Sequence, residues 1–163
     1  MSRDRFTDPG VRLWAFADDI LVRCPRCGGR AVVSPYPEHR ESHPSPAVRL
    51  TAPHRLVCPA CAHTAEWTAR HERGYARPPR LTGPNGPFFD LPLWLSRPCC
   101  GHVLWAYNEP HLTLIESYVS AHLRERGGWT GSGSMLEHLP AWIKAASNRP
   151  ELLKTIQALR STL

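Results

Sequence analysis

Four cysteines arranged in two CxxC pairs restrict the fold of this chain more than any other feature. The pairs are Cys24-Pro25-Arg26-Cys27 and Cys58-Pro59-Ala60-Cys61. A CxxC turn can present two thiolates to one ion, so two turns supply the four ligands of a tetrahedral site. In the first pair a proline stiffens the turn and two following glycines let the backbone fold back beneath the metal. The second pair repeats the proline but not the glycine. The spacing predicts one structural zinc ion, bound by Cys24, Cys27, Cys58 and Cys61.

Other uses of the cysteines stay open at this point. They could staple a secreted domain as disulfides, one pair could act alone in redox chemistry, or iron could replace zinc in the same geometry. The N-terminal residues 1–6 lack the apolar run of a signal peptide, and no stretch of about 18 apolar residues could cross a membrane. We therefore expect a soluble, cytoplasmic protein without a membrane partner, in which thiols stay reduced or bind metal.

The charge of the chain is uneven. Residues 1–80 carry 13 Lys and Arg against 8 Asp and Glu, whereas residues 81–163 carry 7 against 6. A basic surface suits contact with phosphate, so the N-terminal half is a candidate nucleic-acid surface. Arginine makes up 18 of the 20 cations in a chain also rich in alanine and proline, a bias that a high-GC genome produces without selection for nucleic acid.

Residues 1–80 are predicted to form one β domain. An apolar run at 11–16 precedes a strand at 20–22, which leads into the first cysteine turn, and a strand at 31–33 leaves it. Residues 34–46 carry four prolines and predict a solvated loop, in which His39 and His43 are less favoured as metal ligands. Strands are expected at 47–50, 54–57 and 64–68.

Residues 81–163 are predicted to form a second region, after a proline-rich linker at 77–87. Apolar strands at 88–95 and 103–107 flank Cys99-Cys100-Gly101-His102 and predict an aromatic hairpin. Its aromatic residues Trp94, Trp105 and Tyr107 could stack on bases, but their aliphatic neighbours favour core packing.

The cysteine turn of this hairpin resembles a third metal knuckle in which Arg97 replaces the leading cysteine. Cys99, Cys100 and His102, with Asp90 nearby in sequence, could form a second metal site or a thiol site. Buried thiols in a turn are the favoured alternative, because adjacent cysteines on an extended chain point in opposite directions.

About three helices are expected in the last third. Asn108-Glu109-Pro110 predicts a helix start, and an apolar stripe continues to Arg126 before Gly127-Gly128. Ser134 and Glu137 form a capping-box pattern, and Pro140 restarts a helix at 141–143. Pro150 begins a final helix that carries an apolar stripe. His122 and His138 are expected on helices as packing residues. Four cations of this part, expected to be solvated, are Lys144, Arg149, Lys154 and Arg160.

The two cysteine turns together resemble the zinc-ribbon superfamily, as seen in transcription factor IIB, over about 45 residues. That resemblance implies a structural four-cysteine zinc site and a ribbon of β-hairpins. It says little about function, because such ribbons contact DNA, RNA or protein. The long insertion departs from the compact pattern, and residues 81–163 lie outside the resemblance.

These patterns predict an α+β protein that combines zinc-ribbon hairpins, an aromatic hairpin and a helical region. We expect a non-catalytic adaptor that binds a protein partner and, through its basic half, nucleic acid. A closed four-thiolate site leaves no position for water, and the sequence holds no HExxH, Walker or dinucleotide motif. The alternative is an enzyme that uses a metal or thiol site at Cys99, Cys100 and His102.

Overall fold

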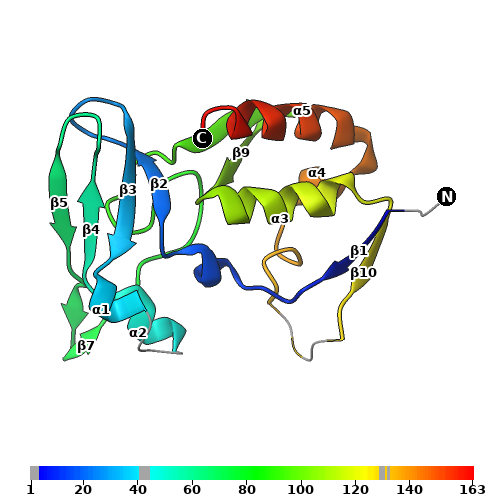
Figure 1. The fold of residues 1–163 in the computed structure, drawn as a ribbon. Coiled ribbons are helices and arrows are strands. Elements are labelled where there is room, and N and C mark those ends of the chain that lie inside the picture. The colour runs from blue at the N-terminus through cyan, green and yellow to red at the C-terminus, as the bar shows by residue number, and fades with distance from the viewer. Residues whose placement is uncertain (1–3, 41–44, 129–130, 132) are drawn as a thin grey trace.

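The computed structural model describes residues 4–40, 45–128, 131 and 133–163. The protein has a mixed α and β structure built from antiparallel hairpins and C-terminal helices. A four-stranded sheet forms one end, and two long helices with a short parallel strand pair form the other (Figure 1). None of the helices in the described part of the chain has the length and apolar character needed to span a bilayer.

The four-stranded sheet is antiparallel and follows chain order. Its strands are β2 (Ile20–Arg23), β3 (Arg30–Pro35), β4 (His54–Val57) and β5 (Thr64–Trp67). Side chains alternate between a buried and a more exposed face along β2, β3 and β4, as period-2 patterning requires. These strands confirm the predictions at 20–22, 31–33, 54–57 and 64–68.

The insertion between β3 and β4 contains helices where we expected a loop and a strand. It holds α1 (Pro37–Arg40) and α2 (Pro46–Thr51), so the strand predicted at 47–50 is wrong. Pro46 stands at the first helical position, where its fixed φ favours a helix, and Ser45 before it is extended. The loop prediction for 34–46 is also wrong in part, because β3 continues to Pro35; His43 lies outside the described residues.

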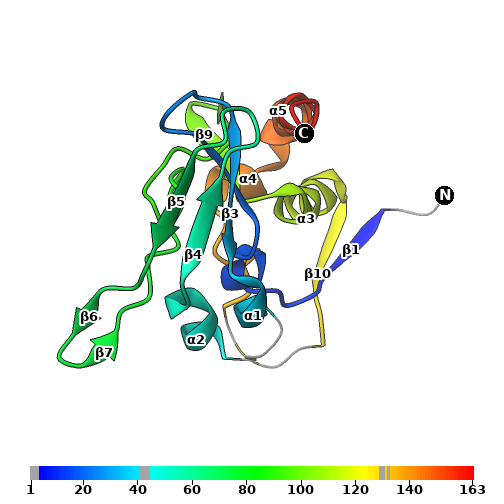
Figure 2. The same cartoon turned by 60° about the vertical axis from the view of Figure 1, so that its left-hand side comes forward.

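Two further short elements flank the sheet. The apolar run at 11–16 contains a 3-10 helix, η1 (Leu13–Phe16). After β5, the chain forms a small hairpin of β6 (His71–Glu72) and β7 (Tyr75–Ala76), which projects away from the body of the molecule (Figure 2). Residues 77–84, at the predicted linker, have no regular structure.

The predicted aromatic hairpin is present, with a shorter first strand than expected. Strand β8 (Leu95–Cys99) pairs with β9 (His102–Ala106), and the two meet at Cys100 and Gly101. Both turn residues have positive φ, 51° at Cys100 and 74° at Gly101. Residues 88–94 instead run irregularly to the sheet, where Leu93 bridges Val22.

The helix predicted from Asn108 to Arg126 is too long. Helix α3 (Glu109–Ser120) begins as expected, with the Asn108 side chain accepting the His111 amide N–H at 3.1 Å. It stops six residues early because the chain then forms β10 (Leu123–Arg126), which pairs in parallel with β1 (Arg5–Asp8). Arg149 stabilises this end by donating to the carbonyl of Val119 at 2.9 Å and to that of Ala121 at 3.1 Å.

The remaining helices are α4 (Ala141–Lys144), a 3-10 turn η2 (Ala146–Asn148) and α5 (Arg149–Arg160). They confirm the restart after Pro140 and the final helix at Pro150. The helical placement of His122 and His138 is wrong: the first lies at the bend before β10 and the second in a turn. Ser134 and Glu137 accept the N–H groups of Leu136 at 3.1 Å and Gly133 at 2.9 Å respectively, but residues 135–138 form a turn, so the pair caps no helix.

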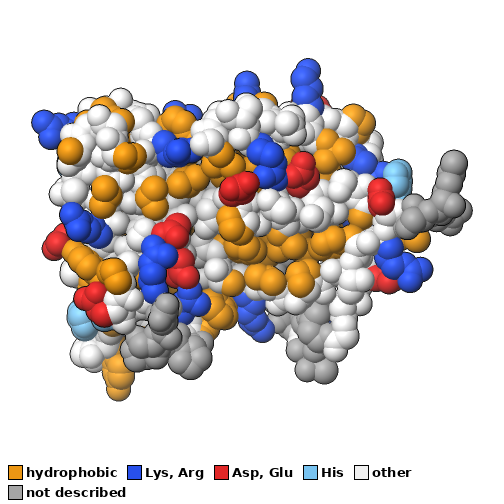
Figure 3. All heavy atoms as spheres, in the orientation of Figure 1, with side chains coloured by type: hydrophobic (Ala, Val, Ile, Leu, Met, Phe, Trp, Pro, Cys, Tyr) orange, Lys and Arg blue, Asp and Glu red, His pale blue; other side chains and the backbone are white. Residues whose placement is uncertain are grey.

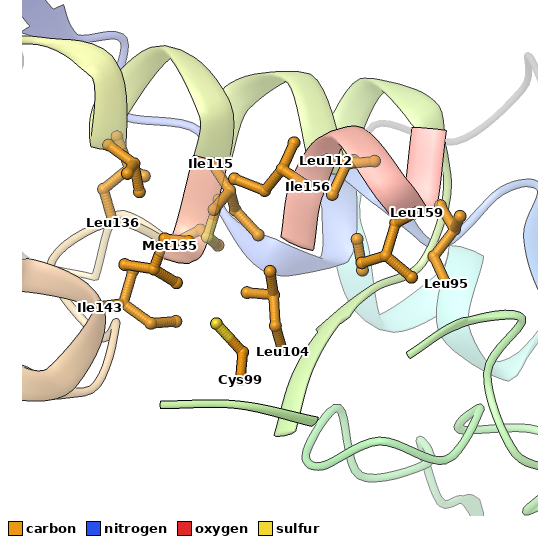
Figure 4. Packing of buried hydrophobic residues seen from close by; sticks show 13 residues of the cluster. Leu95, Cys99, Leu104, Leu112, Ile115, Met135, Leu136, Ile143, Ile156 and Leu159 are labelled. Atoms are coloured by element: carbon orange, nitrogen blue, oxygen red, sulfur yellow. The ribbon is translucent and has the colours of Figure 1, made fainter. Parts of the chain in front are cut away.

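Two clusters of buried side chains make up the core. One joins the β8–β9 hairpin to α3 and α5, with Leu104, Ile115 and Ile156 pointing toward one another (Figure 4). The other lies behind the four-stranded sheet and includes Leu56 and Tyr107. The cluster behind the sheet draws buried residues from each side of position 80, partly buried Phe6 and Phe16 pack against the other cluster, and β1 pairs with β10. The division into regions 1–80 and 81–163 stays a prediction.

Candidate metal centre

The first cysteine turn connects β2 to β3. The amide of Cys24 donates to the carbonyl of Gly29 at 2.8 Å, and the amide of Gly28 donates to the carbonyl of Cys24 at 2.9 Å. Gly28 has φ 74°, a conformation that glycine adopts without strain. The N–H groups of Arg26 and Gly29 point at the sulfurs of Cys24 and Cys27, at 3.4 and 3.3 Å. This backbone holds both sulfurs on one side of the turn.

The second cysteine turn connects β4 to β5 and repeats the same backbone bonds. Cys58 donates to the carbonyl of His63 at 2.9 Å, and Ala62 donates to the carbonyl of Cys58 at 2.9 Å. Ala62 occupies the position equivalent to Gly28 and takes φ 59° despite its Cβ. This left-handed region costs alanine about 1 kcal/mol or more. The turn therefore keeps the geometry of the first one at a conformational cost.

The four sulfurs meet across the two turns. Cys24 Sγ lies 3.7 Å from Cys61 Sγ, and Cys27 Sγ lies 3.6 Å from Cys58 Sγ. All four sulfurs lie within 4.8 Å of one another. A tetrahedral ion with metal–sulfur bonds of about 2.3 Å needs sulfurs about 3.8 Å apart. The arrangement can hold one metal ion.

The environment of the sulfurs already favours a thiolate at one ligand. Burial raises the pKa of Cys24, but the amide N–H groups of Cys27 and Arg26, with the neighbouring thiols, bring that pKa down to about 7. At Cys61 the amide of His63 acts to lower the pKa, but burial and the other three thiols raise it to about 12. The two directions are linked, because the neighbouring thiols donate to a thiolate at Cys24 while the same contacts disfavour a second thiolate at Cys61.

All six cysteines are free thiols, so the described structure contains no disulfide. Cys24 and Cys58 are buried, whereas Cys27 is exposed and Cys61 half-buried. The candidate centre therefore lies at the surface edge of the sheet, with one ligand of each turn anchored in the core. The structure brings all four predicted ligands together in one candidate metal site.

The second predicted cluster is only partly assembled. Cys99 Sγ and Cys100 Sγ lie 3.6 Å apart, but the carboxylate that joins them comes from Glu151 on α5. His102 is not part of that group, because its ring stacks on Trp142 with centroids 4.9 Å apart. Asp90 is likewise absent from it among the described residues. The inclusion of His102 was wrong.

Our expectation that the adjacent thiols point apart also fails. Cys100 leaves the extended conformation at φ 51°, which turns its side chain toward that of Cys99. Its amide donates to the Glu151 carboxylate at 2.8 Å. Burial, Cys99 and Glu151 together raise the pKa of Cys100 to about 12, so the thiol stays protonated in the absence of a cation.

Tyr107 and three of the four predicted helix cations have structural roles. Tyr107 is fully buried and Trp105 packs on it with centroids 5.4 Å apart, so core packing is confirmed for Tyr107, whereas Trp94 and Trp105 are half-buried. Arg160 pairs with Glu109 and Glu116 on α3. Lys144 donates to the Glu137 carbonyl at 2.7 Å.

Sequence reasoning missed three residues with chemical potential. Glu151 joins the second thiol cluster, and His54 and His111 are both buried. Burial lowers the pKa of each histidine to about 4, so both are neutral at physiological pH. His111 stands three residues after the helix cap, on the inward face of α3, and that position was the one signal available. No family model, curated protein or solved structure matches this chain.

Proposed function

We propose that this protein is a zinc-ribbon binding module whose single zinc ion has a structural role. The observation that carries the proposal is the meeting of four cysteine sulfurs, from two turns with the same backbone bonds, at the spacing of a tetrahedral site. Four thiolates leave no open position for water, so the ion would hold the turns together and not activate a substrate. Zinc is preferred because it accepts tetrahedral thiolate sites without redox chemistry, although iron takes the same ligands.

The test of this metal site is the metal content of purified protein, measured by elemental analysis. We expect one zinc per chain in the wild type and none in a Cys24→Ser, Cys58→Ser double variant. Iron in place of zinc would change the assignment of the ion. If the wild type contains no metal even after reconstitution with zinc under reducing conditions, the proposal is refuted.

The β6–β7 hairpin is the surface that we assign to nucleic acid. Residues 70–80 carry four arginines and one glutamate, and Tyr75 at the hairpin is 78% exposed. Only one of those arginines, Arg77, pairs with the glutamate, Glu72, at 3.0 Å. The side chains of Arg70, Arg73 and Arg80 bond to no residue that the structure describes. Cations beside an exposed aromatic ring suit a phosphate backbone and a stacked base.

This assignment is tested by fluorescence anisotropy with a labelled single-stranded oligonucleotide. Binding should weaken steeply between about 50 and 200 mM salt, because each neutralised phosphate releases counterions. A Tyr75→Ala, Arg73→Gln variant should lose affinity, whereas Arg97→Gln, at an exposed arginine of β8, should not. Binding that is insensitive to salt, or equal in both variants, would remove nucleic acid from the proposal. Steep salt dependence toward an acidic protein alone would point to that partner.

The α3 side of the molecule is the surface that we assign to a protein partner. A hollow of about 540 Å³ lies between α3 and the N-terminal segment, with Val11, Phe16 and Leu114 among its lining. Figure 3 shows hydrophobic side chains gathered over this part of the face. Association through such a surface should persist at high salt and be weakened by Leu114→Glu. The two surfaces together would make the protein an adaptor without catalytic activity.

A second candidate function rests on the cluster of Cys99, Cys100 and Glu151. Two sulfurs 3.6 Å apart with a carboxylate within 4.8 Å could supply three ligands, which leaves a fourth position open for a reacting group. Such a site would make the protein a metal- or thiol-dependent enzyme. Two zincs per chain, one of them lost in Cys100→Ser while the other stays, would favour this alternative; one zinc in both proteins would exclude the metal form.

A further inference from the structure

A cavity of about 740 Å³ lies against β9 and α3, and the zinc-ribbon proposal makes no use of it. Its remaining walls come from residues 12–14, 81–83 and 133–143. Pockets of about 300–1,000 Å³ accommodate small organic ligands. The cavity therefore has the size of a small-molecule site.

The walls are strongly aromatic. Trp14, Trp105 and Trp142 all line the cavity, and each is half-buried, so part of each ring faces open space. Trp142 is held in place by the stacked ring of His102. Trp105 meets His111 edge to face, with centroids 5.7 Å apart. Rigid flat walls of this kind favour a planar ligand, which stacks on them at little cost in ordering.

One polar group is directed into this apolar space. His111 lines the cavity and is 2% exposed, and its Nδ1 accepts the amide N–H of Tyr107 at 3.1 Å. Since the ring is neutral, the proton must sit on Nε2. That nitrogen bonds to no residue that the structure describes. Among the described residues, Tyr107 Oη is the only fully buried polar side-chain atom without a partner, so His111 Nε2 cannot be fully buried. The Nε2–H group is therefore reached from the cavity and offers a donor to a ligand.

The charge around the cavity has one sign. Arg12 lines it and is exposed at its edge, whereas no Asp or Glu is found among its described lining residues. A Cβ built on Gly133 would lie 3.1 Å from the Arg12 guanidinium, so the cation lies against the cavity wall. A guanidinium beside an apolar cavity favours a ligand with a carboxylate or sulfonate.

We propose that this cavity binds a small planar aromatic acid. The rings would stack between the three tryptophans, an acceptor atom would take the Nε2–H of His111, and the anionic group would lie at the mouth beside Arg12. No bond is made or broken in this binding. The protein would then carry a small-molecule site in addition to its metal centre.

The experiment compares two probes that share one aromatic skeleton. 8-Anilinonaphthalene-1-sulfonate carries the acid, and N-phenyl-1-naphthylamine has the same rings without it. Each probe is titrated into the 163-residue chain loaded with metal, and binding is followed by energy transfer from tryptophan. We expect one site per chain and tighter binding of the sulfonate, by about tenfold for a charge-assisted contact.

Three variants separate this site from general surface adsorption. Arg12→Gln should weaken binding of the sulfonate by about tenfold and leave the affinity for the neutral probe unchanged. Arg97→Gln replaces an exposed arginine outside the cavity and should change the affinity for neither probe. Leu139→Trp places a larger side chain in the cavity lining and should abolish binding of both probes. Circular dichroism and metal content check that this variant is folded.

Each outcome decides the proposal. Saturable binding of one probe per chain that follows this pattern supports it. Equal affinity for the two probes, with no effect of Arg12→Gln, would overturn the assignment of an acid. Weak binding without saturation, or binding that survives in folded Leu139→Trp, would overturn the site itself; if that variant does not fold, the Arg12→Gln comparison still decides.

Discussion

The two ends of the molecule are held together by different means. The sheet end uses strands of four to six residues, and its outer strand β5 has no buried residue. Its two turns meet at four sulfurs. The helical end packs α3 and α5 on the β8–β9 hairpin around 13 buried hydrophobic residues. We infer that the cysteine turns of the sheet end depend on a bound metal ion in addition to the core cluster behind the sheet, whereas the helical end is stabilised by burial of apolar surface alone.

Metal removal should have the largest effect and act mainly on the sheet end. Structural zinc contributes roughly 10–16 kcal/mol in small zinc-finger peptides, more than most domains have in total. With a strong chelator, we expect amides of β2–β5 to lose protection from hydrogen exchange while those of α3 and α5 retain it. Equal loss at both ends would show that the contrast between them is wrong.

A cavity in the helical core should have the next largest effect. Ile156 is fully buried between α3 and the hairpin, so Ile156→Ala should lower the free energy of unfolding by about 2–5 kcal/mol. Leu153→Ala, one turn away and only half-buried, should cost less. Both free energies come from urea denaturation, and the metal content should be unchanged. Loss of metal in Ile156→Ala would show that the two ends are tightly coupled.

Asn108 stands where the two ends meet, and its replacement should have a moderate effect. Its side chain caps α3 and also donates to the carbonyls of Phe16 at 2.8 Å and Asp19 at 3.2 Å. Asn108→Ala should cost about 1–2 kcal/mol, since a cap and two further bonds are lost. Asn108→Ser keeps a capping oxygen without placing a second acceptor against these carbonyls, and it should cost less. Equal costs by thermal denaturation would mean that the cap contributes nothing and that only the bonds to Phe16 and Asp19 matter.

The smallest expected effect is a reciprocal exchange between the two cysteine turns. Ala62→Gly relieves a positive φ but adds freedom to the unfolded chain, so it should stabilise by about 0.5 kcal/mol. Gly28→Ala should destabilise by about 1 kcal/mol, because nothing within 4 Å would contact the new Cβ and only the conformation is strained. Denaturation of metal-loaded protein measures both. Destabilisation by Ala62→Gly, or stabilisation by Gly28→Ala, would show that the turns differ in more than this residue.

Local patterns explain which features were predictable. The strands beside the cysteine turns, the Asn108 cap and the helix at Pro150 follow from a few neighbouring residues, and all were found where expected. The end of α3 could not be predicted, because it depends on β1 and on Arg149, which are far away in sequence. Helix α2 was missed because a short apolar run beside a proline suits either a strand or a first helical turn.

The candidate sites show the same division. The four metal-binding candidates follow from spacing, since two CxxC turns that meet have few other arrangements. Glu151 could not be grouped with Cys99 and Cys100 from the sequence, because 51 residues separate it from Cys100, whose amide N–H it accepts. The cavity beside His111 was equally hidden, since its walls come from separate segments of the chain.

The amino-acid sequence by itself determined the two cysteine turns and the helices and strands that short-range preferences dictate. Tertiary structure alone decided where those elements end, which carboxylate joins the second pair of thiols, and how three tryptophans and a neutral histidine enclose one cavity. The physical reason is the range of the forces involved. Turn geometry and capping act over a few residues, whereas packing and long-range hydrogen bonds exist only once distant segments have come together.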